Sequence, residues 1–449
     1  MFSKILIANR GEIAVRIIRA CREMGIQTVA VHSDIDQDCL HAQLADEAIC
    51  IGPAKSTESY LNMQNILSAA VATGAQAIHP GFGFLAENST FASMCEECNI
   101  KFIGPKASVI DAMGNKANAR ALMISAGVPV IPGSEGTLDT LEDAKREAKR
   151  LGYPVMVKAS AGGGGKGIRV VRNEEALEKA YESAKSETKA AFGDDTLYME
   201  KLIEHARHIE IQVLGDAFGN VVHLGERDCS LQRRNQKVLE ECPSPALDEA
   251  TRAAMGEAAV RAAKAVGYES AGTIEFLYDT DGNFYFMEMN TRIQVEHPVT
   301  EMVTGIDIVK EQIRIAEGCP LSFTQKDVVI RGHAIECRIN AENPERGFAP
   351  SPGTIHYLLV PGGGLGVRID SAIYPGYTIP PFYDSMIAKV ITYGNTRQEA
   401  IEKMRRCLYE FLISGVDTNI EFQEKILTNE QYQKGLFDTS FISKVILNE

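Results

Sequence analysis

Short apolar runs alternate with amphipathic stretches in the N-terminal quarter of the chain. Brief runs rich in Val, Ile and Ala are typical of buried parallel strands, and an apolar period of about 3.6 residues indicates helices between them. The pattern predicts strands at 4–9, 28–32, 48–51, 77–79 and 101–104, with helices at 11–24 and 65–73. This β-α-β order predicts a doubly wound parallel sheet that ends near Met113. The first strand is not followed by GxGxxG, so a dinucleotide-binding role is poorly supported.

Further along, the pattern changes to strands that return through tight turns. We expect helices at 115–126, 139–150, 246–266 and 306–317, and strands at 153–160, 168–172, 196–203, 209–214 and 221–224. From Asp327 a mainly antiparallel β region is predicted, in which Glu336, Arg338 and Asn340 share one face of a strand at 329–340. A strand at 383–390 and helices at 397–412 and 419–427 complete this region. The predicted fold class is therefore α/β at the N-terminus and α+β after it.

Polar residues occupy every second position from Glu288 to Glu296, whereas the positions between them are mostly apolar. In an extended segment the side chains alternate between two faces, so Glu288, Asn290, Arg292, Gln294 and Glu296 share one face. A solvent-exposed strand is also polar on one side, but its polar residues are interchangeable. Here oxygen ligands stand at one end and an Arg–Gln–Glu group at the other, which favours a functional surface.

A strand that ends at Tyr278 precedes this row and returns through a short turn. With Tyr278 opposite Asn283, Glu275 becomes a diagonal, same-face neighbour of Glu288. Two carboxylates and the carbonyl of Asn290 suit Mg²⁺, which binds few protein oxygens and keeps other positions for phosphate and water. The carboxylate pair could instead be a general acid–base dyad, but the added Asn favours a metal.

A run of four glycines lies within GGGGKG, at 162–167, and joins two predicted strands. It matches GxGxxG formally, but a Rossmann phosphate loop opens a helix, and a Walker A loop needs Ser or Thr where Gly167 stands. A glycine-rich hairpin lets backbone N–H groups approach phosphate oxygens and can move as a lid, with Lys158 and Lys166 adding positive charge. The alternative is a flexible surface hairpin, but consecutive glycines cost folding entropy, so phosphate contact is favoured.

Other features each leave two interpretations open. The loop HPGFGF, at 79–84, is either a ligand-binding loop or a plain turn. The polar run at 226–237 is either an exposed loop or an anion pocket, because Arg and Lys are dense there for an acidic protein. Lys116, on a predicted helix, is indistinguishable from a solvated surface lysine when it is taken alone.

Composition narrows the class of protein. The chain has 449 residues, 45% hydrophobic and 24% charged, as in globular proteins of two or three domains. The net charge of −14 argues against a nucleic-acid surface, and no apolar run predicts a signal peptide or membrane span. The ten cysteines lie mostly singly, and the lone CxxC at 95–98 has no second pair. We interpret them as reduced thiols and expect a cytoplasmic protein without nucleic-acid or membrane partners.

The glycine-rich hairpin, Lys116, Lys158 and the candidate metal ligands together resemble the ATP-grasp superfamily. Longer segments narrow this resemblance: IANRGEIAVRI, HPGFGFLAEN, KASAGGGGKGIRVV, ERDCSLQRRNQKVLEE, EMNTRIQVEHPVTE and GHAIECRINAE. In this order they are similar to the biotin carboxylase subunit of acetyl-CoA carboxylase, from Ile7 to Ala341. The similarity continues through PPFYDSMIAKV, so it covers essentially the whole chain.

The resemblance implies ATP-dependent carboxylation of biotin on a biotin carboxyl carrier protein, with bicarbonate as substrate and carboxyphosphate as intermediate. This is the first half-reaction of acetyl-CoA carboxylase, which feeds malonyl-CoA and fatty acid synthesis. Mg²⁺ or Mn²⁺, carboxyltransferase partners and a homodimer are also implied. The implied domains are an N-terminal one at 1–114, an ATP-grasp domain at 115–326 with a mobile lid at about 131–203, and a C-terminal one at 327–449. Since no Met-Lys-Met biotinylation site or carboxyltransferase region is present, we expect a separate subunit.

The resemblance also assigns roles to residues that match the family's motifs. ATP contacts are implied for Lys116, Lys158, Gly164, Gly165, Glu200, Lys201, Ile203, His208, Gln232 and Asn235. Metal binding is implied for Glu275, Glu288 and Asn290, and bicarbonate binding for Lys237, Arg292, Gln294 and Val295. Glu296 is the implied base, and Arg338 is implied to stabilise the enolate-like oxygen of biotin. Two positions depart from the family: Phe82 stands where Tyr is frequent on the biotin side, and Asn235 where His is expected near the adenine or ribose.

Two other functions are alternatives. Another ATP-grasp ligase acting through an acyl phosphate would not need Arg338 or the row from Arg292 to Glu296. A non-catalytic nucleotide-binding subunit would be expected to have lost a metal ligand or the base, and all of these are present. Bicarbonate is a small planar anion that needs convergent donors, and an enolate oxygen is matched by the delocalised, permanent charge of Arg. These requirements favour biotin carboxylation.

Overall fold

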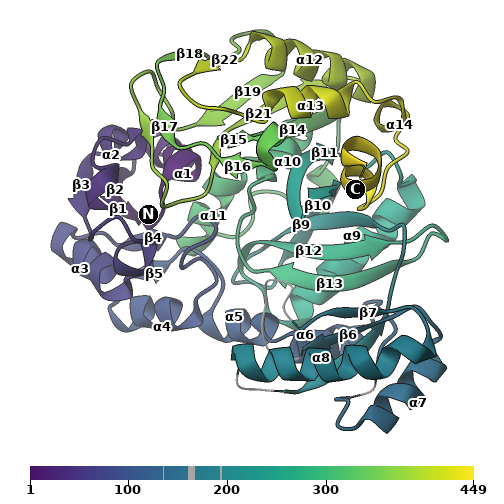
Figure 1. The fold of residues 1–449 in the computed structure, drawn as a ribbon. Coiled ribbons are helices and arrows are strands. Elements are labelled where there is room, and N and C mark those ends of the chain that lie inside the picture. Colours follow the sequence, from purple (N-terminus) through teal and green to yellow (C-terminus); the bar gives the residue numbers. More distant parts are fainter. Residues whose placement is uncertain (135, 160–166, 193–194, 449) are drawn as a thin grey trace.

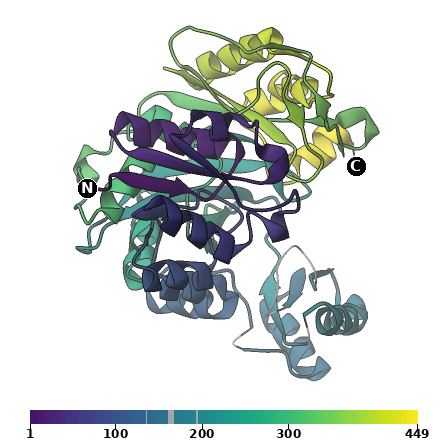
Figure 2. The same ribbon diagram turned by 90° about the vertical axis from the view of Figure 1, so that its left-hand side faces the viewer.

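The computed structural model describes residues 1–134, 136–159, 167–192 and 195–448. Figure 1 shows an N-terminal sheet with its helices, a large sheet built by the middle and the end of the chain, and a small sheet at one end of the molecule. Figure 2 shows the small sheet and its helices standing apart from the rest. Among the described residues, none of the helices has both the length and the apolar character needed to cross a bilayer.

The N-terminal sheet is parallel throughout, with the strand order β3-β2-β1-β4-β5. Its strands are β1 Lys4–Ile7, β2 Gln27–His32, β3 Glu47–Cys50, β4 Ala77–His79 and β5 Lys101–Phe102. Its helices are α1 Gly11–Glu23, α2 Leu40–Leu44, α3 Met63–Thr73, α4 Ser89–Glu97 and α5 Ala107–Gly114. Ile5 and Ile7 pack against α1 and Leu6 packs toward α3 and α4, so β1 is buried on both faces. The predicted doubly wound sheet is confirmed.

In the described part of the chain, eight strands form one continuous antiparallel sheet in the order β13-β12-β9-β10-β11-β14-β21-β19. These strands are β9 Arg207–Gly215, β10 Val221–Arg233, β11 Gln236–Cys242, β12 Ser270–Tyr278, β13 Phe284–Asn290, β14 His333–Asn340, β19 Val367–Ser371 and β21 Met386–Gly394. Strands β11 and β14 pair directly, so the middle and the C-terminal parts share this sheet. The predicted α+β class is confirmed.

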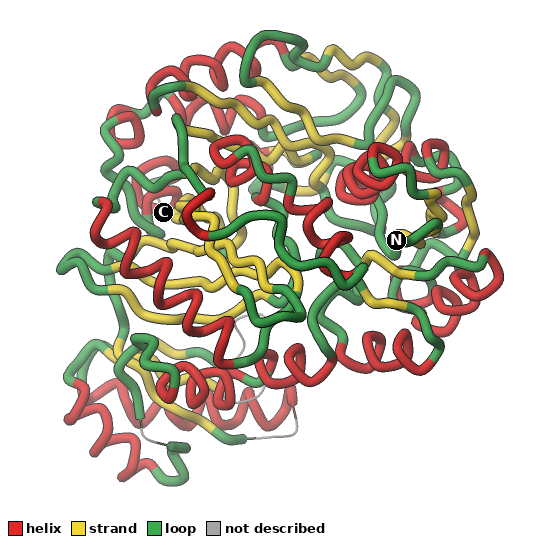
Figure 3. The backbone as a smooth tube through the Cα atoms, turned by 180° about the vertical axis from the view of Figure 1, so that it is seen from behind, coloured by secondary structure: helices red, strands yellow, loops and turns green. Residues whose placement is uncertain are grey.

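Helices cover the apolar face of the large sheet. Helix α9, Glu249–Ala265, packs its alanines on β9 and β12, and Figure 3 shows helices lying across the strands on this side. Helices α12 Arg397–Glu410 and α13 Ile420–Leu427 pack beside it on β14 and β21. The remaining helices of this part are α6 Lys116–Ser125, α10 His297–Thr304, α11 Ile308–Ala316 and α14 Glu430–Gln433. Short strands are β15 Glu342–Asn343, β16 Ala349–Pro350, β17 Gly353–Thr354, β18 Tyr357–Leu359, β20 Thr378–Ile379 and β22 Leu412–Ser414.

The small sheet has the antiparallel order β7-β6-β8 and falls in the range expected for the lid. Its elements are α7 Leu141–Leu151, β6 Val155–Ala159, β7 Arg169–Val171, α8 Glu174–Phe192 and β8 Leu197–Lys201. Every described buried residue of its apolar core lies between Leu138 and Met199. The small sheet and its helices therefore have a core separate from the cores of the rest of the molecule. Sequence analysis assigned no element to 173–195 and therefore missed α8. Most of the glycine-rich hairpin, residues 160–166, lies outside the described residues.

The expected register of the hairpin after Tyr278 is wrong. Tyr278 pairs with Phe284 rather than with Asn283, and a bulge follows Glu275. Glu275 consequently stands directly opposite Glu288 instead of diagonal to it. The two carboxylates are therefore closer neighbours than the sequence analysis expected.

The alternating row from Glu288 to Glu296 is also not a single strand, contrary to expectation. Strand β13 ends at Asn290, residues 291–296 form a loop, and α10 begins at His297 with Pro in its first turn. A proline fits the first turn of a helix because its missing N–H has no partner there. The polar side chains of this segment reach the site from a loop and not from the face of a strand.

Candidate active site

A cavity of about 850 Å³ lies on the polar face of the large sheet. Residues 9–13 and 82–84 of the N-terminal part form one wall, and residues 382–386 of the C-terminal part form another. Much of the loop between β13 and α10 also lines it. Segments that are far apart in the sequence therefore meet at one place.

A row of four charged side chains crosses four neighbouring strands beside this cavity. Arg227 on β10 stands opposite Glu210 on β9, Glu210 opposite Glu275 on β12, and Glu275 opposite Glu288 on β13. Directly opposed residues point to the same face of a sheet, so one cation and three carboxylates lie side by side. The first three residues are buried, whereas the Glu288 side chain is 46% exposed, so the row runs from the interior to solvent.

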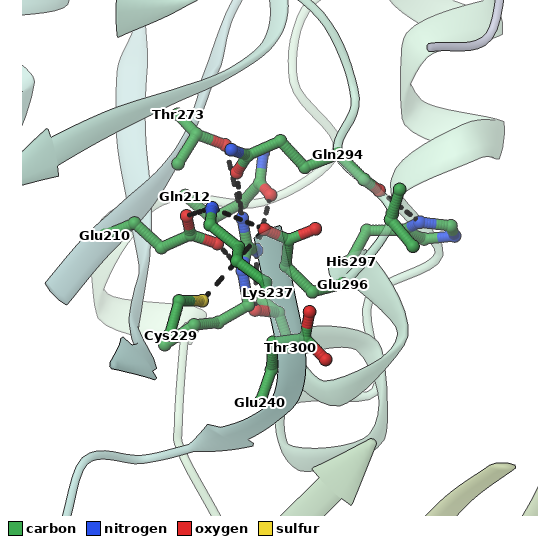
Figure 4. Close-up of polar contacts among 12 residues, drawn as sticks. Glu210, Gln212, Cys229, Lys237, Glu240, Thr273, Gln294, Glu296, His297 and Thr300 are labelled. Carbon is green, nitrogen blue, oxygen red and sulfur yellow. Dashed lines mark hydrogen bonds and ion pairs between the residues drawn. The ribbon is translucent and has the colours of Figure 1, made fainter. Parts of the chain in front are cut away.

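Lys237 neutralises three carboxylates at once. Its Nζ lies 2.5 Å from Glu210 Oε2, 3.0 Å from Glu275 Oε1 and 2.6 Å from Glu296 Oε1, and Figure 4 shows it at the centre of this cluster. An extra residue on β11, Val238, shifts the register there, and a bulge of this kind redirects a side chain. Burial acts to raise the pKa of Glu275 and Glu296, but the neighbouring cations, with Lys237 the strongest, together outweigh it and hold both pKa values well below the usual range.

Arg227 fixes the buried end of the row. Its side chain is fully buried, and its Nε donates to Glu210 Oε1 at 2.5 Å. Its Nη1 donates to Gln212 at 2.7 Å, and its Nη2 donates to Gln294 Oε1 at 2.7 Å. A buried guanidinium is stable only when its donors are paired, and these partners satisfy that condition. Arg227 therefore ties the loop of Gln294 to the sheet.

Arg338 on β14 reaches the same cluster from the opposite side. Its Nη2 donates to Glu296 Oε2 at 3.0 Å, while its Nε donates to Glu240 Oε1 at 2.6 Å. Glu296 therefore lies between Lys237 and Arg338, with one oxygen directed to each. This carboxylate is ionised and rigidly held at neutral pH.

The loop between β13 and α10 is anchored at both faces. Gln294 Nε2 donates to Glu275 Oε1 at 2.8 Å, and Lys389 Nζ donates to the Val295 carbonyl at 2.6 Å. Lys389 is fully buried on β21 and also lies 3.1 Å from Glu12 Oε1. The backbone that carries Gln294 and Val295 is thus held between the large sheet and α1.

Arg292 is held by a residue of the N-terminal part. Its Nε donates to Glu87 Oε2 at 2.8 Å, and its Nη2 donates to Asn290 Oδ1 at 3.1 Å. The other Glu87 oxygen accepts from the backbone N–H of Thr291 at 2.9 Å. Glu87 therefore fixes the first two residues of the loop and aims the Arg292 guanidinium.

His208 completes the buried side of the cavity. Its Nε2 lies 3.1 Å from Glu275 Oε2, and its Nδ1 lies 2.9 Å from Gln232 Nε2. Burial acts to lower the pKa of His208, but the charge and hydrogen bond of Glu275 together with the charge of Glu210 outweigh it, and the pKa is raised. His208 thus adds positive charge beside the row at mildly acidic pH.

The donor set at the open end of the row fits a divalent metal. Glu275 and Glu288 are paired across the hairpin, and Asn290 Nδ2 donates to Glu275 Oε1 at 2.8 Å while its Oδ1 accepts from Arg292 at 3.1 Å, so the Asn290 amide lies beside the first carboxylate. Burial and the charge of Glu275 raise the pKa of Glu288, and Lys116 Nζ lies 3.9 Å from its Oε2. A hard cation would relieve this repulsion, and oxygen ligands are those that Mg²⁺ prefers.

Three family models match consecutive parts of the chain. They describe "Biotin carboxylase, N-terminal domain" at residues 1–110, "Carbamoyl-phosphate synthase L chain, ATP binding domain" at 115–324 and "Biotin carboxylase C-terminal domain" at 336–444. Over 443 residues the chain is 62% identical to biotin carboxylase 1 of Bacillus subtilis, and the match covers 98% of each protein. The chain belongs to the biotin carboxylase family. It is thus an enzyme, an ATP-dependent ligase of this family.

Solved structures of biotin carboxylases have the same fold. A biotin carboxylase–beta-gamma-ATP complex from Campylobacter jejuni is 52% identical with a TM-score of 0.94, covering 99% of each chain. The biotin carboxylase domain dimer of Hydrogenobacter thermophilus 2-oxoglutarate carboxylase is 54% identical with a TM-score of 0.93, covering 99% of this chain and 98% of that one. The latter structure holds MgADP, ADP and bicarbonate.

Most of the residues singled out by the biotin carboxylase resemblance meet in the cavity. Those that line it are Phe82, His208, Gln232, Asn235, Lys237, Glu275, Glu288, Asn290, Arg292, Gln294, Val295, Glu296 and Arg338. The polar run at 226–237 is not an exposed loop, because it forms the end of β10, a turn and the start of β11. The HPGFGF loop supplies three residues to the cavity lining, which favours a ligand-binding loop over a plain turn.

The other candidate residues lie elsewhere. Lys116 borders a neighbouring cavity of about 210 Å³, together with Glu288. On the small sheet, Lys158 pairs with Glu200, and Lys201 Nζ donates to the carbonyls of residues 152 and 153 at 2.9 and 3.0 Å. These residues and Ile203 do not line the larger cavity. The remaining two candidates lie outside the described residues: Gly164 and Gly165.

The two departures from the biotin carboxylase pattern both border the cavity. The carbonyl of Phe82 accepts from Asn9 Nδ2 at 2.7 Å, so the loop is fixed through its backbone and the ring has no hydroxyl to contribute. Asn235 occupies the tight turn between β10 and β11 with φ +63°, a left-handed conformation that Asn tolerates well.

Some polar residues that hold the site together were not among the predicted site residues. Glu87, Glu210, Arg227 and Glu240 are examples. A signal for Glu210 was present, since a charged residue within the apolar strand IEIQVL faces the same side as the Gln two positions later. The partners of the other three are distant in the chain, so local patterns do not single them out.

Proposed function

We propose that this protein carboxylates biotin on a biotin carboxyl carrier protein, using ATP and bicarbonate through a carboxyphosphate intermediate. The observation that carries the proposal is the position of Glu296, an ionised carboxylate between Lys237 and Arg338 at a cavity that Arg292 also lines. A small anion bound there would contact the cations of Lys237 and Arg292 and the carboxylate base of Glu296 at the same time.

In the first step, bicarbonate binds to Lys237, Arg292, Gln294 and the backbone of Val295. Glu296 takes the proton of bicarbonate, and the resulting oxyanion attacks the γ-phosphorus of ATP, which gives carboxyphosphate and ADP. The low pKa of Glu296 keeps it ionised before the anion arrives, and the charge of Lys237 is then divided between the two anions. Positioning and electrostatic stabilisation account for most of the catalysis of a phosphoryl transfer.

Mg²⁺ or Mn²⁺ would be held by Glu275, Glu288 and Asn290, and it would supply positive charge to the transferred phosphoryl group. ATP would be bound by residues of the cavity and of the lid. These residues are Lys116, Lys158, Gly164, Gly165, Glu200, Lys201, Ile203, His208, Gln232 and Asn235. Because Lys158, Glu200, Lys201 and Ile203, the described residues of the lid in this set, do not line the cavity, the lid has to close for all of them to act together.

In the second step, carboxyphosphate breaks down to CO₂ and phosphate. The phosphate removes the proton from the ureido nitrogen of biotin, and that nitrogen attacks CO₂. Arg338 stabilises the enolate-like oxygen that develops on the ureido carbonyl, and Phe82 contributes to the biotin side of the cavity. A permanent, delocalised cation suits this oxyanion better than an ammonium.

We further propose the first half-reaction of acetyl-CoA carboxylase, with a carboxyltransferase partner, a homodimeric assembly and domains at 1–114, 115–326 and 327–449. A cytoplasmic location is supported by all ten cysteines being unpaired. The similarity to a 2-oxoglutarate carboxylase domain makes the final acceptor a question for experiment. Acetyl-CoA, pyruvate and 2-oxoglutarate should be compared with carrier and carboxyltransferase present, and acetyl-CoA is the expected acceptor.

The carboxylation step is tested by ATP hydrolysis with and without free biotin, in bicarbonate and Mg²⁺. We expect biotin to stimulate phosphate release by the wild type. Glu296→Ala should abolish the release, and Arg338→Ala should abolish the stimulation. A folded wild type that binds ATP but does not respond to biotin would contradict the proposal.

A further inference from the structure

Glu240 and Glu336 form a buried pair of carboxylates beside the Arg338 guanidinium. They stand directly opposite each other on β11 and β14, so their side chains share the polar face of the sheet. Both are 0% exposed. Arg338 and Lys389, which oppose each other on β14 and β21, lie on the same face. The steps described above use neither carboxylate of the pair.

Glu240 competes with Glu296 for the same guanidinium. Glu240 Oε1 accepts from Arg338 Nε at 2.6 Å and lies 2.5 Å from Arg338 Nη2. That Nη2 also donates to Glu296 Oε2 at 3.0 Å. Figure 4 shows Glu240 reaching toward the cluster from beneath Glu296. Arg338 is therefore shared, and its position depends on how strongly each carboxylate holds it.

Ionisation of both carboxylates of the pair is energetically unfavourable. Glu240 Oε2 and both oxygens of Glu336 have no hydrogen-bond partner within the part of the chain that the structure describes. A buried carboxylate without partners is costly when ionised, and two of them side by side repel each other. Burial raises the pKa of Glu240 to about 7 against the opposing charge of Arg338, and burial raises the pKa of Glu336 well above its usual range.

The surrounding charges are balanced without Glu240. Three cations and three carboxylates alternate in the cluster: Arg227, Lys237 and Arg338 with Glu210, Glu275 and Glu296. An ionised Glu240 adds a fourth carboxylate to this set. The charged and titratable groups that face the pair are Cys229 on β10, Lys237 on β11, Arg338 on β14, Lys389 on β21 and Glu296 at the start of α10.

We propose that Glu240 is a positioning residue for Arg338, switched by a proton that the Glu240–Glu336 pair holds. When Glu240 is ionised, its charge-assisted hydrogen bond holds the guanidinium on the β11 side and away from Glu296. When Glu240 is protonated, that bond weakens and Arg338 pairs with Glu296. The cation and the base are then paired with each other rather than with the substrates. Biotin-dependent turnover therefore rises as Glu240 ionises. This inference rests on the roles proposed above for Arg338 and Glu296.

The test is the pH dependence of biotin-dependent phosphate release by the full-length wild type, Glu240→Gln and Glu336→Gln. Turnover by the wild type should rise through about pH 7. Glu240→Gln keeps an acceptor but loses the charge, so it should lack this rise and be about 10-fold slower at alkaline pH. Glu336→Gln replaces a carboxyl group that burial already keeps neutral, so its rise should keep the wild-type midpoint and show that Glu240 is the titrating group. A purely structural role of Glu240 would lower turnover at every pH and would not remove the rise.

A rise near pH 7 that persists in Glu240→Gln, or a rise that is lost or displaced in Glu336→Gln, would overturn the inference. Glu336→Gln leaves every contact of Arg338 in place, so it carries the test even if thermal melting shows that Glu240→Gln is misfolded. A wild type without biotin stimulation would instead contradict the proposed function. The two failures are therefore distinguishable.

Discussion

Lys237 and Arg227 are the two cations around which the carboxylates of the site are arranged. Each contacts Glu210, and Lys237 also contacts Glu275 and Glu296. All of these carboxylates are buried, so their charges depend on the two cations rather than on water. Removing one cation leaves repelling carboxylates in a place that solvent hardly reaches.

Replacement of Lys237 by Met should therefore destabilise the protein by about 3–5 kcal/mol, the usual cost of breaking a buried ion pair. Urea unfolding at neutral pH measures this change. Lys145→Met is the matched control, because Lys145 pairs only with the surface residue Glu142 in the described contacts. Its unfolding midpoint should stay at the wild-type value. Equal midpoints for the two variants would contradict the role given to Lys237.

Local sequence patterns predicted residues that would bind metal or substrate, but they did not predict the residues that hold those side chains in position. Glu288 and Glu296 were found because their alternation is visible within a short stretch. Glu87 was missed because its partner, Arg292, is 205 positions away. Glu240 lies three positions beyond the predicted polar run at 226–237, and its role depends on Arg338, 98 positions later. Such pairings follow from strand order and domain packing, which a local pattern does not contain.

The loop between β13 and α10 is the element that brings these parts together. Its anchors include Glu87 from the N-terminal part, Arg227 and Glu275 from the middle of the sheet, and Lys389 from β21. The sequence predicted the polar face of this segment, but it could not show that Pro298 starts a helix and that β13 has already ended. The bulge after Glu275 was equally invisible, because it depends on strand pairing.

Glu87→Gln should weaken the contacts that hold the first two residues of this loop, so the Arg292 guanidinium should be less well oriented. Loss of a charge-assisted hydrogen bond at this position should raise the KM for bicarbonate about 10-fold, with a smaller effect on kcat. Steady-state ATP hydrolysis at varied bicarbonate measures both constants. Glu97→Gln, at an exposed position of α4, is the control and should match the wild type. An unchanged KM in Glu87→Gln would show that the loop does not need this anchor.

On the scale of the whole molecule, the large sheet and the lid differ in how they are attached. The C-terminal core includes Leu231 and Leu239 from β10 and β11, so it is continuous with the middle of the chain. The described core of the lid instead contains only lid residues. The parallel N-terminal order was predictable from alternating strands and helices, whereas the β11–β14 pairing that joins the two later parts was not.

Two deletions test the difference between the shared core of the C-terminal part and the separate core of the lid. Removal of 328–449 exposes the edge of β11 and an apolar surface, so we expect the remaining chain to aggregate. Replacement of 135–198 by a short Gly-Ser linker should leave a folded protein that has lost ATP hydrolysis. Size-exclusion chromatography and far-UV circular dichroism measure both outcomes. A folded, monodisperse C-terminal deletion would contradict the shared core.

Transfer of a carboxyl group from bicarbonate to biotin in the cavity can be measured with radiolabelled bicarbonate. Wild-type protein, ATP, Mg²⁺ and biotin should give acid-labile labelled carboxybiotin, and omission of ATP should abolish it. Glu296→Gln should bind ATP and form no labelled product, because the base between Lys237 and Arg338 is gone. A folded wild type that hydrolyses ATP without labelling biotin, or a Glu296→Gln variant that labels it at the wild-type rate, would contradict the account.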